Sequence, residues 1–281
     1  MTKGVIIFAH NNPSIDYVKQ AAFCSEHVDR HLGLPVSLIT SDREYIHENT
    51  WIKKYFQDII FIGAENIRQN KKFFNGRENY VKDSWHNHSR DLAYELSPYA
   101  ETLVIDSDYF IHNKNLLRCF SSKEDLLVHQ QATYLNAQSK KIIPDFISDA
   151  GVIMYWATVF YFKKTKRVRR FFDLLKHIRE NWSYYRFAYQ IVESNFRNDF
   201  AFSIAIHILN GWQRGTWPHK IPDTLFYITD RDLIESYQQD TWKFFLSYSN
   251  DRDVVFRSNK INVHVMNKLA LSKIVGENIH E

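Results

Sequence analysis

The first 110 residues alternate short apolar runs with segments of helical character, and this alternation restricts the fold more than any other feature. The apolar runs span residues 5–9, 36–40, 58–62 and 102–105. Runs of this length with little polar alternation are typical of strands covered on both faces. Residues 14–32 and 84–96 read as helices, because Ser14 and Asp16 begin the first and Gly33 follows it. This order predicts an α/β fold with a mixed, mostly parallel sheet flanked by helices.

The second half is less regular but shows no boundary, repeat or low-complexity tract. Strand-like runs span 125–129, 151–162, 226–228 and 261–265, and helical patterns span 167–181 and 198–209. A chain of 281 residues can bury one large core. We therefore expect a single compact domain over residues 1–281, in which residues 113–281 complete the sheet begun by residues 1–112.

Composition and charge exclude some classes of protein. Hydrophobic residues make up 44% and charged residues 24% of the chain, which excludes a disordered protein. The net charge of +4 permits a phosphate-bearing ligand. Cys24 and Cys119 fit no metal or redox spacing, and no apolar run suits a signal peptide or a bilayer crossing of about 20 residues. We expect a soluble, cytoplasmic protein without a transmembrane segment.

The strongest chemical signal lies directly after the fourth apolar run, in residues 105–108 (IDSD). Asp106 and Asp108 are placed beyond the carboxyl end of a strand, where open parallel sheets bind their ligands. Carboxylate oxygens suit Mg²⁺ or Mn²⁺. Such an ion bridges a diphosphate and neutralises the charge that develops on a leaving nucleotide. The position therefore predicts a metal site.

The Asp-x-Asp motif alone is weak. The chain has 19 aspartates and three such motifs, at 106–108, 230–232 and 251–253, where chance predicts about one. Only the first follows an apolar strand in the α/β half. The alternative for it is a solvated turn with an aspartate cap.

Residues 102–108 (TLVIDSD) resemble the strand and Asp-x-Asp signature of the GT-A (Rossmann-like) glycosyltransferases. The resemblance implies that Asp106 and Asp108 bind Mn²⁺ or Mg²⁺ and that Asp106 and Ser107 contact a nucleotide-sugar donor, with a UDP-sugar favoured. It also implies a nucleotide-sugar-binding half at residues 1–112 and an acceptor-binding half at residues 113–281.

Residues 263–268 (VHVMNK) are similar to the late strand of glycogenin-like retaining transferases. The similarity implies that His264 completes the metal site and that Lys268 contacts the diphosphate, with retention of anomeric configuration. The spacing departs from that family, because Lys268 follows His264 by four residues instead of six and no glycine lies between them. The alternative for a single histidine is a core or surface position.

Four further residues are candidates for donor binding. His10 and Asn11 follow the first strand, and Asp42 follows the second. In a GT-A arrangement these loops border the base and the ribose. Arg90 precedes the Asp-x-Asp strand, and its guanidinium suits a phosphate or a donor sugar. A solvated helix face is the alternative for Arg90.

Asp199 is the candidate catalytic residue. It stands with Asn198 at the start of the predicted helix 198–209. Its carboxylate could act as a general base or hold sugar hydroxyls. Helix capping is the alternative, since it is the common role of Asn and Asp at such a position.

Residues 163–170 carry six cations at the start of a predicted helix. Cations are unfavourable near a helix N-terminus, so the run indicates an anionic partner, either nucleic acid or anionic lipid. A solvated helix start is the ordinary alternative. The residues are Lys163, Lys164, Lys166, Arg167, Arg169 and Arg170.

Together these features predict a metal-dependent glycosyltransferase that moves a sugar from a nucleoside-diphosphate sugar to a hydroxyl acceptor. The acceptor is either a hydroxymethylated base in DNA, flipped from the stack as for some phage enzymes, or a cell-surface glycan. A metal-dependent nucleotidyltransferase is one alternative, but residues 10–13 (HNNP) after the first strand have no glycine or lysine to hold a triphosphate. A non-catalytic nucleic-acid-binding protein is the other, and it leaves the aspartates without a purpose.

Overall fold

A computed structural model describes residues 2–63, 69–86, 89–136, 145–249 and 252–279. Its centre is a seven-stranded sheet in the order β11-β8-β10-β6-β1-β2-β3. Strand β10 runs antiparallel to both neighbours, and the other adjacent pairs are parallel. This confirms the predicted mixed, mostly parallel sheet. The strands are β1 (Lys3–Phe8), β2 (Val36–Thr40), β3 (Asp58–Phe61), β6 (Glu101–Asp106), β8 (Leu126–His129), β10 (Trp156–Lys163) and β11 (His219–Lys220).

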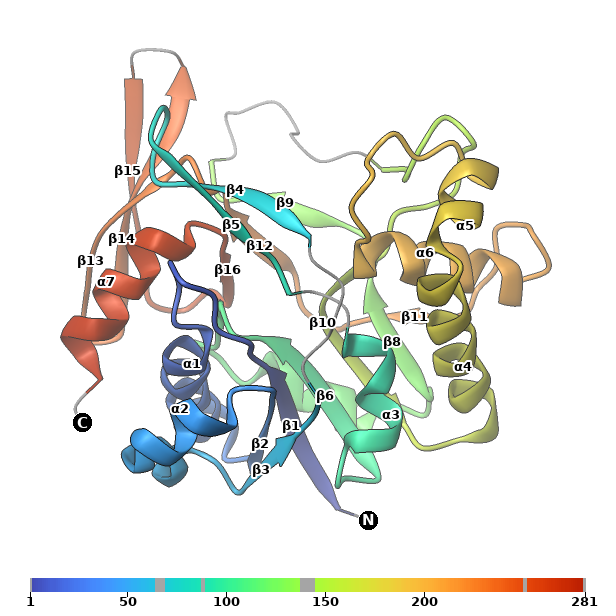
Figure 1. Cartoon of the computed structure of the whole chain (residues 1–281), viewed down its shortest axis with the longest axis horizontal. Coiled ribbons are helices and arrows are strands. Elements are labelled where there is room, and N and C mark those ends of the chain that lie inside the picture. The colour runs from blue at the N-terminus through green and yellow to red at the C-terminus, as the bar shows by residue number, and fades with distance from the viewer. Residues whose placement is uncertain (1, 64–68, 87–88, 137–144, 250–251, 280–281) are drawn as a thin grey trace.

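Helices flank this sheet in a single compact domain (Figure 1). One group lies beside β1 to β3, and α1 packs there against β2 and β7. A second group lies beside β8 and β10, where α6 packs against β10 and α4 against α6. The first group is α1 (Tyr17–Leu32), α2 (Arg43–Glu48) and the 3-10 helix η1 (Thr50–Tyr55), and the second is α3 (Ala93–Leu96), α4 (Lys166–Glu180), α5 (Trp182–Ala188) and α6 (Asn198–Leu209).

Local signals explain the ends of α1. The Asp16 side chain accepts a hydrogen bond from the Lys19 N–H at 2.8 Å, and Gly33 follows the helix in the left-handed conformation with φ 61°. A glycine adopts that conformation without steric strain. Both ends were therefore predictable from sequence.

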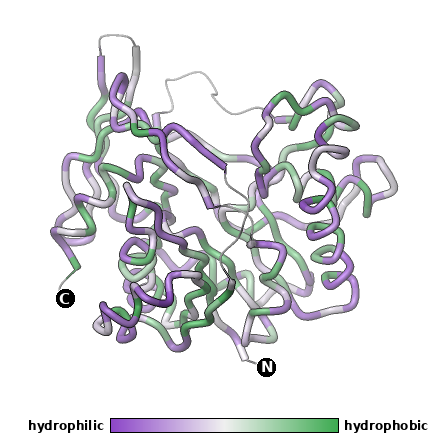
Figure 2. The backbone as a smooth tube through the Cα atoms, in the orientation of Figure 1, coloured by the Kyte–Doolittle hydropathy of each residue, from purple (hydrophilic) through white to green (hydrophobic). Residues whose placement is uncertain are grey.

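Three smaller sheets lie above the carboxyl ends of β1 and β6 (Figure 1). Figure 2 shows hydrophobic residues along the central strands and hydrophilic residues along the hairpin β4–β5. The second half thus adds β8, β10 and β11 to the main sheet but also builds sheets of its own. The smaller sheets are β7 (Tyr109–Phe110), β16 (Val263–Val265), β12 (Leu225–Ile228) and β9 (Ala132–Tyr134); β13 (Leu233–Gln238), β14 (Thr241–Ser249) and β15 (Arg252–Ser258); and β4 (Asn70–Phe74) with β5 (Tyr80–Ser84).

The prediction of one helix over residues 84–96 is wrong. Residue Ser84 ends β5, where it pairs with Asn70 of β4. Only η2 (Ser89–Leu92) and α3 are helical, and residues 87–88 lie outside the described part. Hairpin pairing uses the backbone of Ser84, and the Trp85 N–H donates to the Gln69 carbonyl at 2.8 Å, so no helix begins at these two residues. Within the described ranges, no helix has both the length and the apolar character that a bilayer crossing requires.

His129 makes the fold sensitive to acid. It ends β8, and its Nε2 atom is buried without a hydrogen-bond partner. Burial lowers the pKa of His129 to about 3, whereas an unfolded chain binds the proton below about pH 6.5. Stability is therefore full above that pH and declines by about 1.4 kcal/mol per pH unit as the pH falls toward 3.

We expect His129→Phe to remove this part of the pH dependence. Urea unfolding at about pH 7 and about pH 5 should show a loss of stability that is about 2 kcal/mol smaller for the variant than for the unaltered chain. Other buried histidines are common to both proteins, so their effects cancel. Equal losses in the two proteins would show that His129 is solvated or partnered.

Candidate active site

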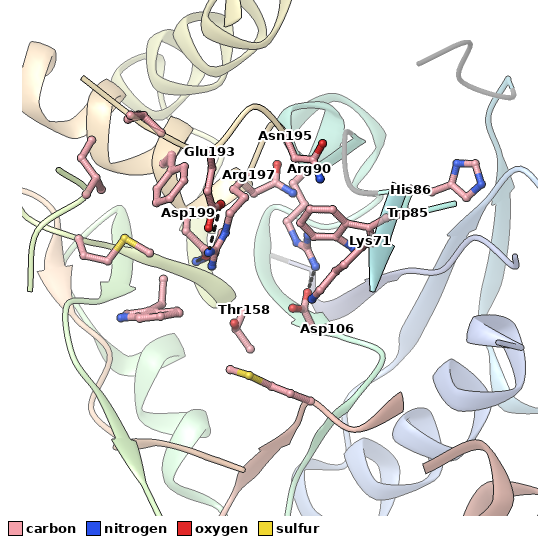
Figure 3. Close-up of a pocket in the computed structure, with 18 of the residues that line it drawn as sticks. Lys71, Trp85, His86, Arg90, Asp106, Thr158, Glu193, Asn195, Arg197 and Asp199 are labelled. Atoms are coloured by element: carbon pink, nitrogen blue, oxygen red, sulfur yellow. Dashed lines mark hydrogen bonds and ion pairs between the residues drawn. The ribbon is translucent and has the colours of Figure 1, made fainter. Parts of the chain in front are cut away.

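A cavity of about 970 Å³ opens at the carboxyl ends of the parallel strands (Figure 3). Phe8 and Asp106 end β1 and β6 in register, and both line it. Because β10 is antiparallel, its first residue, Trp156, reaches the same edge. The start of α6, the hairpin β4–β5, residues 147–149 and 190–195, and the segment from His264 to Lys268 also contribute to the wall. This is the place where open α/β sheets bind ligands.

Asp106 ends β6 and forms an ion pair with Arg90 of η2. Both side chains are largely buried in the cavity wall, and Figure 3 shows Arg90 and Lys71 pointing toward Asp106. The structure thus brings together two residues that the sequence predicted for donor binding. Ser107 is buried and also lines the cavity.

Asp108 is 2% exposed and lies in the turn between β6 and β7. Its carboxylate accepts a hydrogen bond from Nζ of Lys268 and lies 3.1 Å from Nε2 of His264. Pairing of β16 with β7 sets His264 beside Tyr109, and the Val265 N–H donates to the Asp108 carbonyl at 2.9 Å. Burial raises the pKa of Asp108, but the charges of Lys268 and His264 outweigh it and hold that pKa well below its usual range.

Asp106, Asp108 and His264 offer ligand atoms that all lie within 4.8 Å of one another. Two carboxylates and an imidazole suit a divalent cation. Nε2 of His264, 3.1 Å from Oδ2 of Asp108, faces the Asp108 carboxylate, and Nδ1 of His264 is buried without a hydrogen-bond partner. The three residues therefore fit the divalent cation expected from the sequence.

Asp199 lies in the first turn of α6 and lines the cavity. Its Oδ1 atom accepts from the Ala157 N–H at 2.8 Å, and its Oδ2 atom accepts from Arg197 at 2.9 Å. Both oxygens therefore hold α6 against β10 and the preceding loop. Each oxygen accepts only one of these bonds and keeps a further acceptor site, and a role of Asp199 as general base stays a prediction.

The residues predicted to bind the nucleotide-sugar donor form hydrogen bonds between the loop after β1 and the loop after β2. Asp42 accepts hydrogen bonds from the Asn11 N–H at 2.8 Å and from the Thr40 hydroxyl at 3.1 Å. Nδ1 of His10 accepts from the Ser41 N–H at 3.1 Å. Of the three candidates in these loops, only His10 lines the cavity.

The six cations of residues 163–170 do not line the cavity. Lys163 and Lys164 donate to the carbonyls of Ser122 and Ser97, at 2.6 and 2.7 Å. Arg167 donates to both carboxylate oxygens of Asp125, at 2.6 and 3.1 Å. These contacts satisfy part of the positive charge within the protein. Lys166, Arg169 and Arg170 are exposed.

The sequence reading missed several residues that line the cavity. Lys71 of β4 and Trp85 just after β5 come from the hairpin, and the Lys71 ammonium lies 5.1 Å from the centre of the Trp85 ring. Burial, together with the charges of Lys268 and Arg197, lowers the pKa of Lys71 to about 8. No motif marks these residues in the sequence, because their placement depends on the hairpin.

In the other two Asp-x-Asp motifs, the described aspartates Asp230, Asp232 and Asp253 do not line the cavity. Asp232 is fully buried and bonded to neighbouring segments. Asp253 is 39% exposed in its side chain and pairs with Arg77, and Asp251 lies outside the described residues.

No protein-family description matches the chain, and no curated protein matches it in sequence. Among solved structures it is similar to the glycosyltransferase GlyE of Streptococcus pneumoniae TIGR4, with 16% identity and a TM-score of 0.40, over 74% of this chain and 43% of that one. The chain thus spans less than half of the GlyE structure.

Two further solved structures are similar in fold. The galactosyltransferase LgtC in complex with donor and acceptor sugar analogs has 13% identity and a TM-score of 0.45, over 72% of this chain and 70% of that one. A cytidylyltransferase from Leptospira borgpetersenii has 10% identity and a TM-score of 0.33, over 66% and 73%.

Proposed function

We propose that this chain is a metal-dependent glycosyltransferase that moves a sugar from a nucleoside-diphosphate sugar to a hydroxyl acceptor. The observation that carries the proposal is the convergence of Asp106, Asp108 and His264 in a cavity of about 970 Å³. Among the described residues, four Lys and Arg side chains line the same cavity and suit the negative charge of a diphosphate. These are Lys71, Arg90, Arg197 and Lys268.

The metal residues and the basic residues have separate tasks in this reaction. Asp106, Asp108 and His264 would hold a divalent cation, Mn²⁺ or Mg²⁺, which would neutralise charge on the leaving diphosphate. In this structure Arg90 pairs with Asp106 and Lys268 pairs with Asp108. Both basic side chains are therefore placed to turn to the phosphate oxygens of a donor. Their contacts with a donor would orient it against the acceptor side of the cavity.

The two halves of the chain would divide the substrates, with the metal at their junction. We assign the donor, with a UDP-sugar favoured, to residues 1–112, which include His10, Arg90, Asp106 and Ser107 in the cavity wall. Residues 113–281 contribute Trp156, Asn198 and Asp199 to the cavity wall, and we assign the acceptor to them. His264 and Lys268 cross this division, because β16 brings them back to Asp108.

The test is a thermal-unfolding panel of UDP- and GDP-sugars with and without Mn²⁺, followed by an assay of donor hydrolysis. A donor at 100 times its Kd should stabilise the fold by roughly 2.7 kcal/mol and raise the Tm by about 5 °C. The shift should require the metal. Stabilisation by nucleoside triphosphates alone, with release of pyrophosphate, would instead establish a nucleotidyltransferase.

For the acceptor we propose a hydroxyl group, either of a hydroxymethylated DNA base or of a cell-surface glycan. We place the reaction in the cytoplasm. The free, buried thiols of Cys24 and Cys119 stay reduced in that compartment. The exposed cations Lys166, Arg169 and Arg170 would hold the DNA backbone. A retardation assay at low salt tests this, with the three residues changed to Gln as the comparison. Absence of binding to duplex would eliminate DNA.

A further inference from the structure

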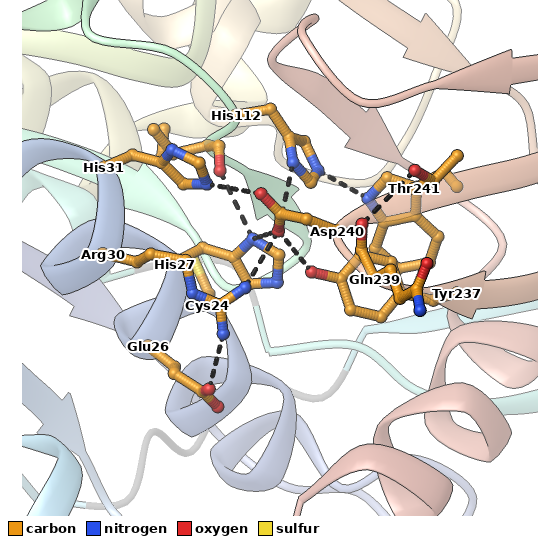
Figure 4. A network of polar contacts seen from close by, with 12 residues as sticks. Cys24, Glu26, His27, Arg30, His31, His112, Tyr237, Gln239, Asp240 and Thr241 are labelled. Carbon is orange, nitrogen blue, oxygen red and sulfur yellow. Dashed lines mark hydrogen bonds and ion pairs between the residues drawn. The ribbon is translucent and has the colours of Figure 1, made fainter.

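Four ligand-type side chains meet away from the active-site cavity, at the junction of three segments (Figure 4). His27 and His31 lie one turn apart on α1, His112 follows β7, and Asp240 lies in the turn between β13 and β14. One ligand atom of each residue lies within 4.8 Å of those of the other three. None of the four lines the cavity that holds Asp108.

The imidazole nitrogens of His31 and His112 lie at ion-pair distance from the Asp240 carboxylate. Nε2 of His31 lies 3.0 Å from Oδ2 of Asp240, and Nδ1 of His112 lies 3.6 Å from Oδ1. Both nitrogens are nevertheless buried without a hydrogen-bond partner. Two ligands placed 2.0–2.2 Å from one zinc ion lie about 3.3 Å apart at the tetrahedral angle. The 3.0 Å separation of Nε2 of His31 and Oδ2 of Asp240 is close to this value.

The hydrogen bonds around the cluster assign its protons. Nδ1 of His27 lies 3.3 Å from the Ile111 carbonyl, which can only accept, so the free electron pair is on Nε2. That Nε2 atom is buried and has no partner. The Trp242 indole donates to Nε2 of His112 at 2.7 Å, so the His112 proton is on Nδ1, which faces Asp240. His27 thus keeps an electron pair free on Nε2 while its Nδ1 lies 4.0 Å from Oδ1 of Asp240, and His112 is placed to orient the carboxylate.

Asp240 is held so that one oxygen stays available. Its Oδ1 atom accepts from the Tyr237 hydroxyl at 2.7 Å and from Arg30 at 3.0 Å, which leaves Oδ2 facing His31. Gln239 and Asp240 have φ angles of 48° and 62°, a left-handed backbone conformation that residues other than glycine rarely adopt. The fold therefore maintains a strained turn that places this carboxylate among the histidines.

We propose that His27, His31 and Asp240 bind a divalent zinc ion, with His112 orienting the carboxylate, and that this ion ties α1 to the hairpin β13–β14. Two histidines four residues apart on a helix present both rings on one face. Two imidazoles and one carboxylate suit zinc, whereas the two carboxylates at Asp106 and Asp108 suit a harder ion. This site is independent of glycosyl transfer.

The test is the metal content of the full chain, purified from zinc-supplemented medium without chelator. We expect about one zinc per chain, and its loss in His31→Gln and in Asp240→Asn. The variant His264→Gln is the matched control and should keep this zinc. His112→Asn should keep the site but bind zinc about 10- to 100-fold more weakly, as expected for an orienting residue.

A second measurement does not depend on the folding of variants. Cobalt added to the metal-free chain should give the intense visible absorption of a tetrahedral centre, and a chelator should remove it and lower the Tm of the unaltered protein. A chain without bound zinc and without this spectrum would overturn the proposal and identify a metal-free polar network. Full zinc content in His31→Gln would also overturn it.

Discussion

Asp108→Asn is expected to lower metal-dependent turnover of the donor by about a thousandfold or more, equivalent to about 4 kcal/mol of transition-state stabilisation. Asp108 is the residue on which the proposed metal site converges, since His264 and Lys268 both contact its carboxylate. An amide keeps the shape of the side chain but removes the charge that binds the cation. The measurement is donor hydrolysis with Mn²⁺, as kcat/KM.

The same substitution also disturbs the fold, and the experiment must separate the two effects. Asp108 and Lys268 form a buried pair, with side chains 3% and 13% exposed. Removal of one charge from such a pair destabilises by about 3–5 kcal/mol, because the other stays buried and unpaired. The double variant Asp108→Asn with Lys268→Met should recover most of that stability and stay inactive.

Asp253→Asn is the matched control, because Asp253 belongs to another Asp-x-Asp motif and pairs with Arg77 at the surface. It should keep full turnover. Full turnover in Asp108→Asn would instead show that the metal assignment is wrong, whatever its stability.

Asp232→Asn is expected to lower the free energy of unfolding by about 3–5 kcal/mol. Asp232 is fully buried, and its carboxylate accepts four hydrogen bonds. The Tyr134 hydroxyl and the Ser247 N–H donate to one oxygen at 2.7 and 2.8 Å, and the N–H and hydroxyl of Thr229 donate to the other at 2.6 and 2.8 Å. An amide nitrogen in place of either oxygen faces two of these donors.

Urea unfolding at neutral pH measures this effect. The variant should keep the donor turnover of the fraction that remains folded, because Asp232 does not line the cavity. Asp253→Asn again serves as the control, with a change of at most about 0.5 kcal/mol. An unchanged unfolding midpoint for Asp232→Asn would mean that the four hydrogen bonds contribute little.

Asp108 and Asp232 show that the same Asp-x-Asp motif can line a cavity or stabilise the core. Asp108 follows a strand of the main sheet and faces a cavity, whereas Asp232 follows β12 and turns inward to bind Thr229, Tyr134 and Ser247. The local sequences are alike in having two aspartates beside one intervening residue. Their contexts differ in the segments that pack around them.

Strands and helices with local causes were predictable. The apolar runs became β1, β2, β3 and β6, and the helix predicted over residues 198–209 is α6. Continuous burial on both faces requires continuous apolar sequence, so these elements are visible in the residues themselves. Hairpin β4–β5 was not predicted, because its strands are largely polar and depend on each other and on contacts with distant segments.

The structure also changes the interpretation of the basic run at residues 163–170, because it shows which groups contact these side chains. Its sequence indicated six cations without partners, yet Asp125 and the carbonyls of Ser97 and Ser122 take three of them. Those acceptors lie 41 or more positions away in the chain. A charge pattern therefore cannot distinguish a ligand patch from internal pairing.

By itself the sequence determined an α/β chain with Asp106 and Asp108 directly after a buried strand, because apolar periodicity and strand ends are local properties. Only the tertiary structure decided that His264 and Lys268, 156 and 160 positions from Asp108, reach its carboxylate, and that His27, His31 and Asp240 converge elsewhere. The pairing of β16 with β7 and the turn between β13 and β14 create these contacts. Such pairings depend on the packing of distant segments, which no local pattern specifies.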